Sequence, residues 1–181
     1  MKLQIKRLTE TAVMPVKAHP TDSGFDLFAD EEVVIEPNET IAVSTGIAIA
    51  LPDGYEAQIR PKSGITSKTD LRVQLGTVDE PYRGEVKVIV DNKALPNYRV
   101  DEVNGRLIVA PQETTIIENL ACEEIQFCES FPENSILIER GTKIAQMVIA
   151  PVAHPEIIEV DELDETDRGA NGFGSTGVTA R

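Results

Sequence analysis

The chain has 181 residues, of which 41% are hydrophobic and 4% aromatic, a length that favours one domain with a core of its own. Its 17 Lys and Arg residues stand against 31 Asp and Glu residues, giving a formal net charge of −14; this argues against stable binding to nucleic acid or an anionic membrane, because both require surplus positive charge. No stretch approaches the roughly 18 consecutive apolar residues of a membrane span, and the first residues lack the apolar core of a signal peptide, so we expect a cytoplasmic protein.

Alternation of apolar with other residues, the period of a β-strand, recurs along the chain. It is present at 41–51, 55–60, 71–75, 86–90, 100–103, 106–109, 135–138 and 144–149. Asn104-Gly105 is the dipeptide that best supplies the two positive φ angles of a tight hairpin turn. The only stretch that favours a helix is short, at 63–69. We therefore predict an all-β fold, a jelly-roll-like sandwich or barrel with one short helix.

Polar clusters interrupt the predicted strands at four places. They lie at 18–27, at 60–64 where the short helix begins, at 76–84 between two glycines, and at 140–146. Asp26 is followed by apolar residues and so enters a strand, while Asp79 and Tyr82 are expected to be held close together by a short hairpin. Taken singly, each cluster is explained by a turn, a capped helix start or a polar loop.

The C-terminal tail has an unusual composition. Residues 172–177 match the pattern G-x-G-x-x-G, but only four residues follow, so the βαβ unit of a dinucleotide site is excluded. Clustered glycines do let backbone N–H groups form an anion-binding concavity, to which Arg168, Ser175 and Thr176 would add donors. Phe173 needs a partner on which to stack. Composition alone does not decide between a flexible terminus and an arm that binds a ligand.

In this order, the five segments resemble the five motifs of the trimeric dUTP diphosphatase (dUTPase) family. The strongest matches are Gly-Thr-Val-Asp-x-x-Tyr-Arg-Gly at 76–84 and Arg-Gly-x-x-Gly-Phe-Gly-Ser-Thr-Gly at 168–177. The resemblance extends over residues 3–177, nearly the whole chain. It implies a jelly-roll homotrimer whose three active sites are each assembled from all three subunits.

The resemblance also implies an activity, the hydrolysis of dUTP to dUMP and pyrophosphate, with a role for each motif. Asp79 would take a proton from the water that attacks the α-phosphorus, and Asp26 would help to hold hydrated Mg²⁺. Tyr82 would pack beneath the deoxyribose, and the tail of a third subunit would close over the site with Phe173 on the uracil. The expected substrate-binding residues are Lys62, Ser63, Gly64, Gly76, Val78, Tyr82, Gln146, Arg168, Phe173, Gly174, Ser175 and Thr176.

Two features depart from the family pattern. Lys62 and Lys143 stand where the family usually has arginine, which keeps the charge but loses the bidentate fork. Residues 91–133 form an insert between the third and fourth motifs, as in relatives from phages of Gram-positive bacteria and their hosts. We therefore expect a β-domain at 1–160 and a flexible arm at 161–181. The insert, rich in Ile and Val, is a candidate docking site for a protein partner.

Two other interpretations remain open. A dCTP deaminase-like enzyme would share the fold, although that class typically lacks the tyrosine of the third motif and the complete Gly-Phe-Gly tail. A nucleotide-sensing regulatory protein would act chiefly through the insert. Three observations distinguish these hypotheses. Pyrophosphate release from dUTP indicates a dUTPase, ammonia release from dCTP indicates a deaminase, and capture of a partner through the insert indicates a regulatory protein.

Overall fold

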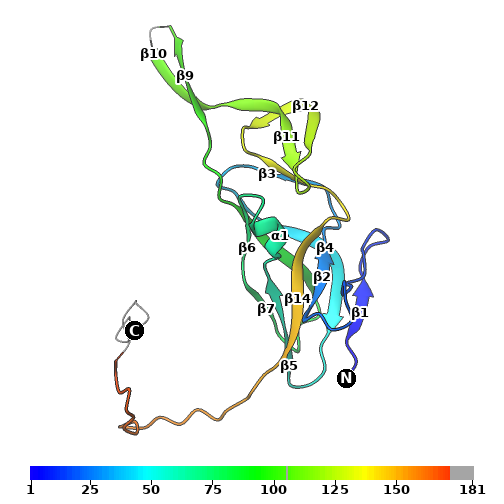
Figure 1. The fold of residues 1–181 in the computed structure, drawn as a ribbon, viewed down its shortest axis with the longest axis vertical. Helices are drawn as coiled ribbons and strands as arrows, with labels where there is room; N and C mark the ends of the chain where they lie inside the picture. The colour runs from blue at the N-terminus through cyan, green and yellow to red at the C-terminus, as the bar shows by residue number, and fades with distance from the viewer. Residues whose placement is uncertain (105, 172–181) are drawn as a thin grey trace.

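The computed structural model describes residues 1–104 and 106–171, and it confirms an all-β, jelly-roll-like sandwich with one short helix (Figure 1). Two four-stranded sheets form the body. The first contains, in spatial order, β1 (Gln4–Arg7), β4 (Thr40–Ala50), β8 (Glu85–Asn92) and β6 (Leu71–Val73). The second contains β2 (Gly24–Phe28), β14 (Lys143–Pro151), β5 (Tyr55–Arg60) and β7 (Gly76–Val78).

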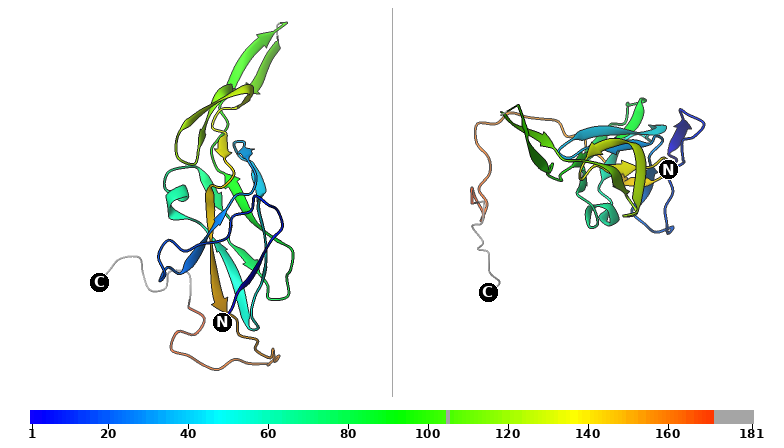
Figure 2. Two further views of the ribbon diagram at one scale, coloured as in Figure 1. Left: turned by 90° about the vertical axis from the view of Figure 1, so that its right-hand side faces the viewer. Right: turned by 90° about the horizontal axis from the view of Figure 1, so that it is seen from above.

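The insert extends the sandwich at one end (Figure 2). A third sheet contains β12 (Glu124–Pro132), β11 (Glu113–Asn119), β13 (Ile136–Ile138) and β3 (Val33–Ile35). Beyond it projects a hairpin of β9 (Tyr98–Val103) and β10 (Arg106–Pro111), in which Val103 pairs with Arg106 across the predicted turn. Among residues 1–104 and 106–171, no helix is long and apolar enough to cross a membrane.

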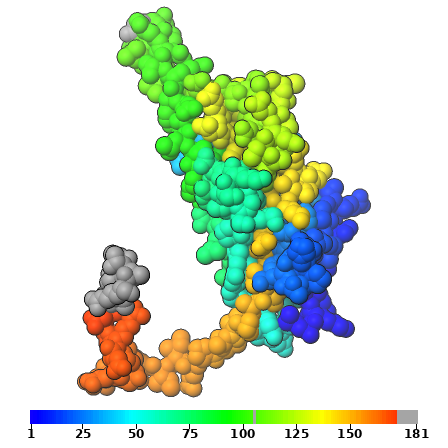
Figure 3. All heavy atoms as spheres, in the orientation of Figure 1, coloured from blue at the N-terminus to red at the C-terminus, as the bar shows by residue number. Residues whose placement is uncertain are grey.

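The predicted alternation produces the core between the two body sheets. On β8, Val86, Val88 and Val90 are buried while Lys87 and Ile89 are exposed. Residues from both sheets, among them Leu27, Ile47, Ala57 and Met147, join the same apolar cluster. Burial of this apolar surface is the main favourable term that holds the sheets together. The chain from 153 to 171 is exposed and leaves the body as an extended arm (Figure 3).

The helix is shorter than predicted: α1 spans Ser63–Thr66 rather than 63–69. Lys62 at its N-cap makes no side-chain capping bond, and the β-branched Ile65 and Thr66 favour helix only weakly. One turn forms because Ile65 is buried in the core and thereby ties it to the sandwich. The chain must then reach β6, where Leu71 is also buried.

The predicted hairpin at 76–84 is also corrected. β7 pairs with β5 in one sheet, through Val78 opposite Ala57, whereas β8 pairs with β4 and β6 in the other. The segment between them therefore crosses from sheet to sheet. It still brings Asp79 and Tyr82 into one turn, because the N–H of Tyr82 donates to the carbonyl of Asp79 at 3.0 Å.

Candidate active site

Asp26 is the centre of a charged cluster at one edge of the second sheet. Its carboxylate accepts from Lys62 Nζ at 2.9 Å through Oδ1 and from Lys143 Nζ at 2.8 Å through Oδ2. Gln146 Nε2 approaches Oδ1 at 3.5 Å. Asp26 is only 3% exposed. The structure thus brings together four residues from the first, second and fourth sequence motifs.

Strand register explains how distant residues meet here. Gln146 on β14 is opposite Asp26 on β2 and opposite Arg60 on β5, so three adjacent strands align. Lys62 lies two residues beyond Arg60, where the chain enters α1, and Lys143 begins β14. Gly24 gives the Gln146 side chain room, because a Cβ there would lie 3.1 Å from Gln146 Cβ.

The two lysines keep Asp26 ionised. Burial raises the pKa of the Asp26 carboxyl, but the hydrogen bonds from Lys143 and Lys62 outweigh burial and leave the pKa below its usual value. A carboxylate that is buried, charged and paired with more than one cation is typical of a site built for charged ligands.

A cavity of about 280 Å³ opens beside this cluster. Its lining residues are Lys62, Gly64, Ile65, Lys68, Leu120, Ala121, Glu139, Thr142 and Lys143. Three lysines against one glutamate make it a cavity for an anion. Sequence reasoning found Lys62, Gly64 and Lys143 but missed Lys68, Glu139 and the insert residues Leu120 and Ala121. Ser63, also predicted, is exposed on α1.

A buried asparagine attaches the insert to this cavity. Asn119, 3% exposed, donates from Nδ2 to Glu139 at 2.9 Å and to Glu123 at 3.1 Å. Its Oδ1 accepts the N–H groups of Ala121 at 2.9 Å and Glu123 at 3.0 Å. These bonds fix the turn after β11 against the segment that leads to Lys143. No sequence pattern marks this contact, because it depends on the parallel pairing of β11 with β13.

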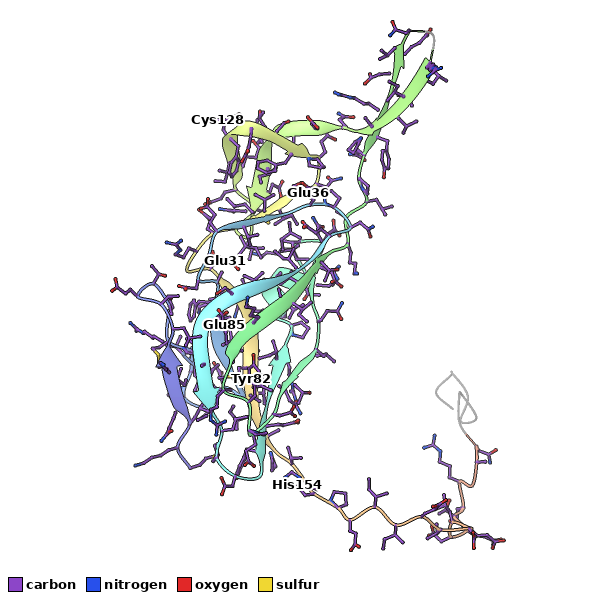
Figure 4. The ribbon with its side chains drawn as sticks, turned by 180° about the vertical axis from the view of Figure 1, so that it is seen from behind. Glu31, Glu36, Tyr82, Glu85, Cys128 and His154 are labelled. Carbon is purple, nitrogen blue, oxygen red and sulfur yellow. The ribbon has the colours of Figure 1, made fainter. Side chains whose placement is uncertain are left out.

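The loop after β7 forms the second part of the candidate site. Asp79 and Tyr82 are exposed, and Tyr82 Oη donates to the carbonyl of Glu85 at 3.0 Å. Val78 is 9% exposed with its side chain in the core, so only its backbone is free to contact a ligand. Gly76 pairs with Ile59 at the start of the same strand. Figure 4 shows Tyr82 and Glu85 on the sandwich, far from Cys128 in the insert.

Within one chain, these two parts lie at opposite ends of β5. The Asp26 cluster lies beyond Arg60, at the C-terminal end of β5. Because β7 is antiparallel to β5 and Val78 pairs with Ala57, Asp79 lies toward the N-terminal end of β5. The three-residue step from Ala57 to Arg60 alone covers about 10 Å. Along the β5 ladder, Asp79 and the lysines of one chain are therefore separated by at least about 10 Å.

Arg168, the predicted tail residue that lies within the described ranges, is not part of either group. Arg168 is exposed on the extended arm, where its Nε donates to the carbonyl of Asn171 at 3.0 Å. Phe173, Gly174, Ser175 and Thr176 lie outside the described residues.

The candidate site offers magnesium one buried carboxylate. Within the described ranges 1–104 and 106–171, no three His, Cys, Asp or Glu side chains gather at metal-binding distances. Asp26, held ionised, fits Mg²⁺ as an ion that keeps several waters and takes its remaining ligands from one or two carboxylates and from substrate phosphates.

A cavity lined by lysines beside a buried carboxylate, with an acid–tyrosine loop at the other end of β5, fits the class of enzymes that act on phosphorylated substrates. The model of the dUTPase family matches residues 10–120 and 107–177, and the chain belongs to this family. A deoxyuridine 5'-triphosphate nucleotidohydrolase from Gloeothece citriformis is 42% identical over 182 residues, which cover 99% of both chains. The insert is therefore not confined to phage relatives.

Two solved structures are also similar. A Staphylococcus bacteriophage 80alpha dUTPase with dUpNHpp, described among phage dUTPases that control transfer of virulence genes, has a TM-score of 0.86 and 34% identity, over 98% of this chain and 99% of that one. A phage phi11 dUTPase of S. aureus, described with a structural Mg(II) ion, has a TM-score of 0.79 and 32% identity, over 91% of this chain and 100% of that one.

Proposed function

We propose that the chain hydrolyses dUTP to dUMP and pyrophosphate, which limits uracil incorporation into DNA and supplies dUMP for dTTP synthesis. One observation carries the proposal: in a chain of the dUTPase family, Lys62, Lys143 and Gln146 converge on Asp26 beside an anion cavity of about 280 Å³. Donors at fixed positions around phosphate oxygens supply most of the stabilisation that phosphoryl transfer requires.

Asp79 is the general base of the proposed reaction. Its carboxylate is exposed at the end of β7, where it can accept a proton from the water that attacks the α-phosphorus in line. The backbone of Gly76 and Val78 reads the edge of the uracil, and the Tyr82 ring packs under the deoxyribose, where a ribose 2′-hydroxyl would clash. Lys62, Ser63, Gly64 and Gln146 bind the phosphates.

The proposed active site is shared between subunits of a homotrimer. Because Asp79 and the lysines lie at opposite ends of β5 in one chain, the loop of one subunit must meet the cavity of another. The arm at 161–181, with Arg168, Phe173, Gly174, Ser175 and Thr176, comes from a third subunit and closes over the nucleotide.

Magnesium is the proposed cofactor, held as a hydrated ion by Asp26 and the substrate phosphates. When bound, it neutralises the charge that develops on the pyrophosphate leaving group. Lys62 and Lys143 add compact positive charges beside the same phosphates, without the bidentate fork of arginine.

An assay of pyrophosphate release with Mg²⁺ tests this function. We expect turnover of dUTP and almost none of dTTP, dCTP or UTP. Asp79→Asn should retain nucleotide binding but lose turnover by at least about 10²-fold, the lower range for a general base. Ammonia release from dCTP would instead identify a deaminase, and equal turnover of UTP would contradict the role of Tyr82.

We also propose that the insert binds a protein partner. One face of its hairpin carries Tyr98, Val100, Leu107 and Val109, which are 60–74% exposed. The opposite face carries Arg99 and Asp101, which form an ion pair at 3.0 Å, together with Val103 and Ile108, which are less exposed at 46% each. Contiguous exposed apolar side chains on one side of a hairpin are typical of a protein interface.

Affinity capture with and without a non-hydrolysable dUTP analogue tests this second role. Wild type is compared with Val100→Ser/Leu107→Ser and with Arg99→Ser, which alters only the opposite face. A single identified partner that is lost with the apolar variant alone, in a nucleotide-dependent manner, supports the proposal. Equal capture by all three proteins contradicts it.

A further inference from the structure

Asp26 has two cationic partners rather than one. Lys62 Nζ contacts Oδ1 at 2.9 Å and Lys143 Nζ contacts Oδ2 at 2.8 Å, so each carboxylate oxygen has its own ammonium group. The lysines come from different elements, one preceding α1 and the other beginning β14. A divalent cation that approaches this carboxylate therefore meets an ammonium group at each oxygen.

The local charge opposes the approach of a cation in the free chain. Two ammonium groups and one carboxylate leave the cluster with a net charge of +1, and the formal charges of Lys68 and Glu139, which line the same cavity, cancel. Charges of the same sign at these separations repel strongly where solvent screening is incomplete. A polyphosphate in the cavity reverses the situation, because it supplies oxygens for the ammonium groups and negative charge for the cation.

The two lysines have the freedom to change partners. Their side chains are 27% and 43% exposed, against 4% for Asp26, and both line the cavity. Lysine carries a point charge on a flexible stem, whereas an arginine paired with a carboxylate is held by a planar fork. Lysine at both positions therefore favours exchange from the carboxylate to a phosphate.

We propose that Lys62 and Lys143 hold both carboxylate oxygens of Asp26 in ion pairs in the nucleotide-free chain, an arrangement that we call the latch. When a polyphosphate binds, both ammonium groups move to its oxygens, and the Asp26 carboxylate becomes available to the divalent cation. The polyphosphate is that of the proposed function, on which this inference rests. Nucleotide and cation then bind interdependently, and by linkage each strengthens the binding of the other to the same extent.

Titration with Mn²⁺ alone, followed by the electron paramagnetic resonance signal of the free ion, tests the latch without catalysis. The nucleotide-free wild type should bind Mn²⁺ weakly. Lys143→Met, which frees Oδ2, should bind at least about tenfold more tightly, a modest estimate for removing one partner of a buried ion pair. Lys62→Met provides a second variant should the first fail to fold, as judged by circular dichroism.

Lys93→Met is the matched control. Lys93 pairs with Asp91 at 2.8 Å, with side-chain exposures of 55% and 4%, outside the candidate site. Its removal changes the formal net charge of −14 by the same one unit. Asp91 keeps hydrogen bonds from Thr40 and Gln74, one to each oxygen, so no gain in Mn²⁺ affinity is expected. An equal gain in Mn²⁺ affinity in this variant would show that the effect comes from the overall charge of the chain, and it would overturn the latch.

Titrations in the presence of nucleotide separate failure of the latch from failure of the proposed function. With a non-hydrolysable dUTP analogue, wild type should bind Mn²⁺ as tightly as Lys143→Met does alone, or more tightly. If the nucleotide-free wild type already matches Lys143→Met, the latch is refuted. If the analogue does not bind in a calorimetric titration with Mg²⁺ present, the proposed function fails, while the metal-only comparison still judges the latch.

Discussion

The side chain of Tyr82 leaves no room for a side chain at position 84. A Cβ on Gly84 would lie 2.5 Å from Tyr82 Cζ and 3.0 Å from Cε2. Because those atoms are the far end of a movable ring, the ring would shift at little cost in stability. Gly84 therefore fixes the position of the tyrosine rather than the fold.

Gly84→Ala should therefore weaken discrimination between sugars. We expect kcat/KM for dUTP to fall about tenfold relative to that for UTP, the loss for one poorly packed contact of roughly 1.4 kcal/mol. Tyr82→Phe is the control, since it keeps the ring and loses only the bond to the Glu85 carbonyl. Unchanged selectivity in Gly84→Ala would show that the ring does not exclude the 2′-hydroxyl.

Asp91 provides a test of pH-dependent stability away from the active site. It is 2% exposed, and the hydrogen bonds from Lys93 and Thr40 outweigh burial, with a further one from Gln74, so its pKa is below the usual value. A carboxyl whose folded pKa is lowered stabilises the fold above its unfolded pKa of about 3.9. That stabilisation disappears as the pH falls through the folded pKa.

Asp91→Asn should thus lower the free energy of unfolding at neutral pH, and it should lower it by a smaller amount in acid. Loss of charge-assisted bonds at a buried site is expected to lower the free energy of unfolding by about 2 kcal/mol at pH 7. Urea denaturation at pH 7 and pH 3, at equal protein concentration, measures the change. Asp101→Asn, in an ion pair that is about half exposed, should cost under about 0.5 kcal/mol. Equal losses at both pH values would contradict the assignment to the Asp91 carboxylate.

Single-residue chemistry could be predicted only in part from the sequence. Asp26, Asp79 and Tyr82 are recognisable because each stands in a motif with a defined chemistry. The partners of Asp26 are not, since Lys143 is distant in the chain and reaches it through strand pairing. Lys68 and Glu139 were missed because an exposed lysine or glutamate has no distinguishing local pattern.

The bulge of β4 links the sandwich to the Tyr82 loop. Register in the β4–β8 pair shifts between Ser44 and Ala48, and Gly46 within it has a φ of 64°. The N–H of Gly46 donates to Glu85 Oε1 at 3.0 Å, and the Ser44 hydroxyl donates to the same oxygen. Burial raises the pKa of Glu85, but these bonds outweigh it and keep the carboxylate charged. The residue whose carbonyl holds Tyr82 is thus anchored in the bulge.

Gly46→Ala should destabilise this element. An alanine must adopt the positive φ, at about 1 kcal/mol, and its Cβ would clash with the Asp30 carboxylate and approach Ala12 Cβ at 2.8 Å, which adds about 1–3 kcal/mol. Gly54→Ala is matched, with a φ of 77° but nothing within 4 Å. Urea denaturation should give a larger loss for Gly46→Ala; equal losses would leave no role for the clash.

The predicted strands are present because alternation indicates which face is buried, but the sequence analysis did not predict β1, β3, β11 or β12. The helix and the third-motif segment were predicted less well. One turn of α1 persists through tertiary burial of Ile65 rather than through capping. The segment at 76–84 has the glycines of a hairpin, but its two ends pair with different sheets, and such pairing is set by the whole fold.

At the scale of the whole molecule, the sequence predicted an all-β sandwich but contained no signal for how subunits assemble. Three-fold packing has no period along a chain. The structure gives a geometric reason for the proposed assembly, since β5 separates Asp79 from the Asp26 cluster within one chain. The extended arm, exposed from 153 to 171, likewise has no contact that would bring Arg168 to the cavity of its own chain.

Mixed trimers test whether the active site crosses subunits. Asp79→Asn and Lys62→Met/Lys143→Met should each form inactive homotrimers. After both proteins are denatured together in equal amounts and refolded, half of the subunits carry an intact Asp79 and half carry intact lysines. If the two groups of one site come from different chains, about a quarter of the sites are complete, and dUTP turnover should return to about a quarter of the wild-type value. If both groups act within one chain, no site is complete and turnover stays at the level of the separate variants.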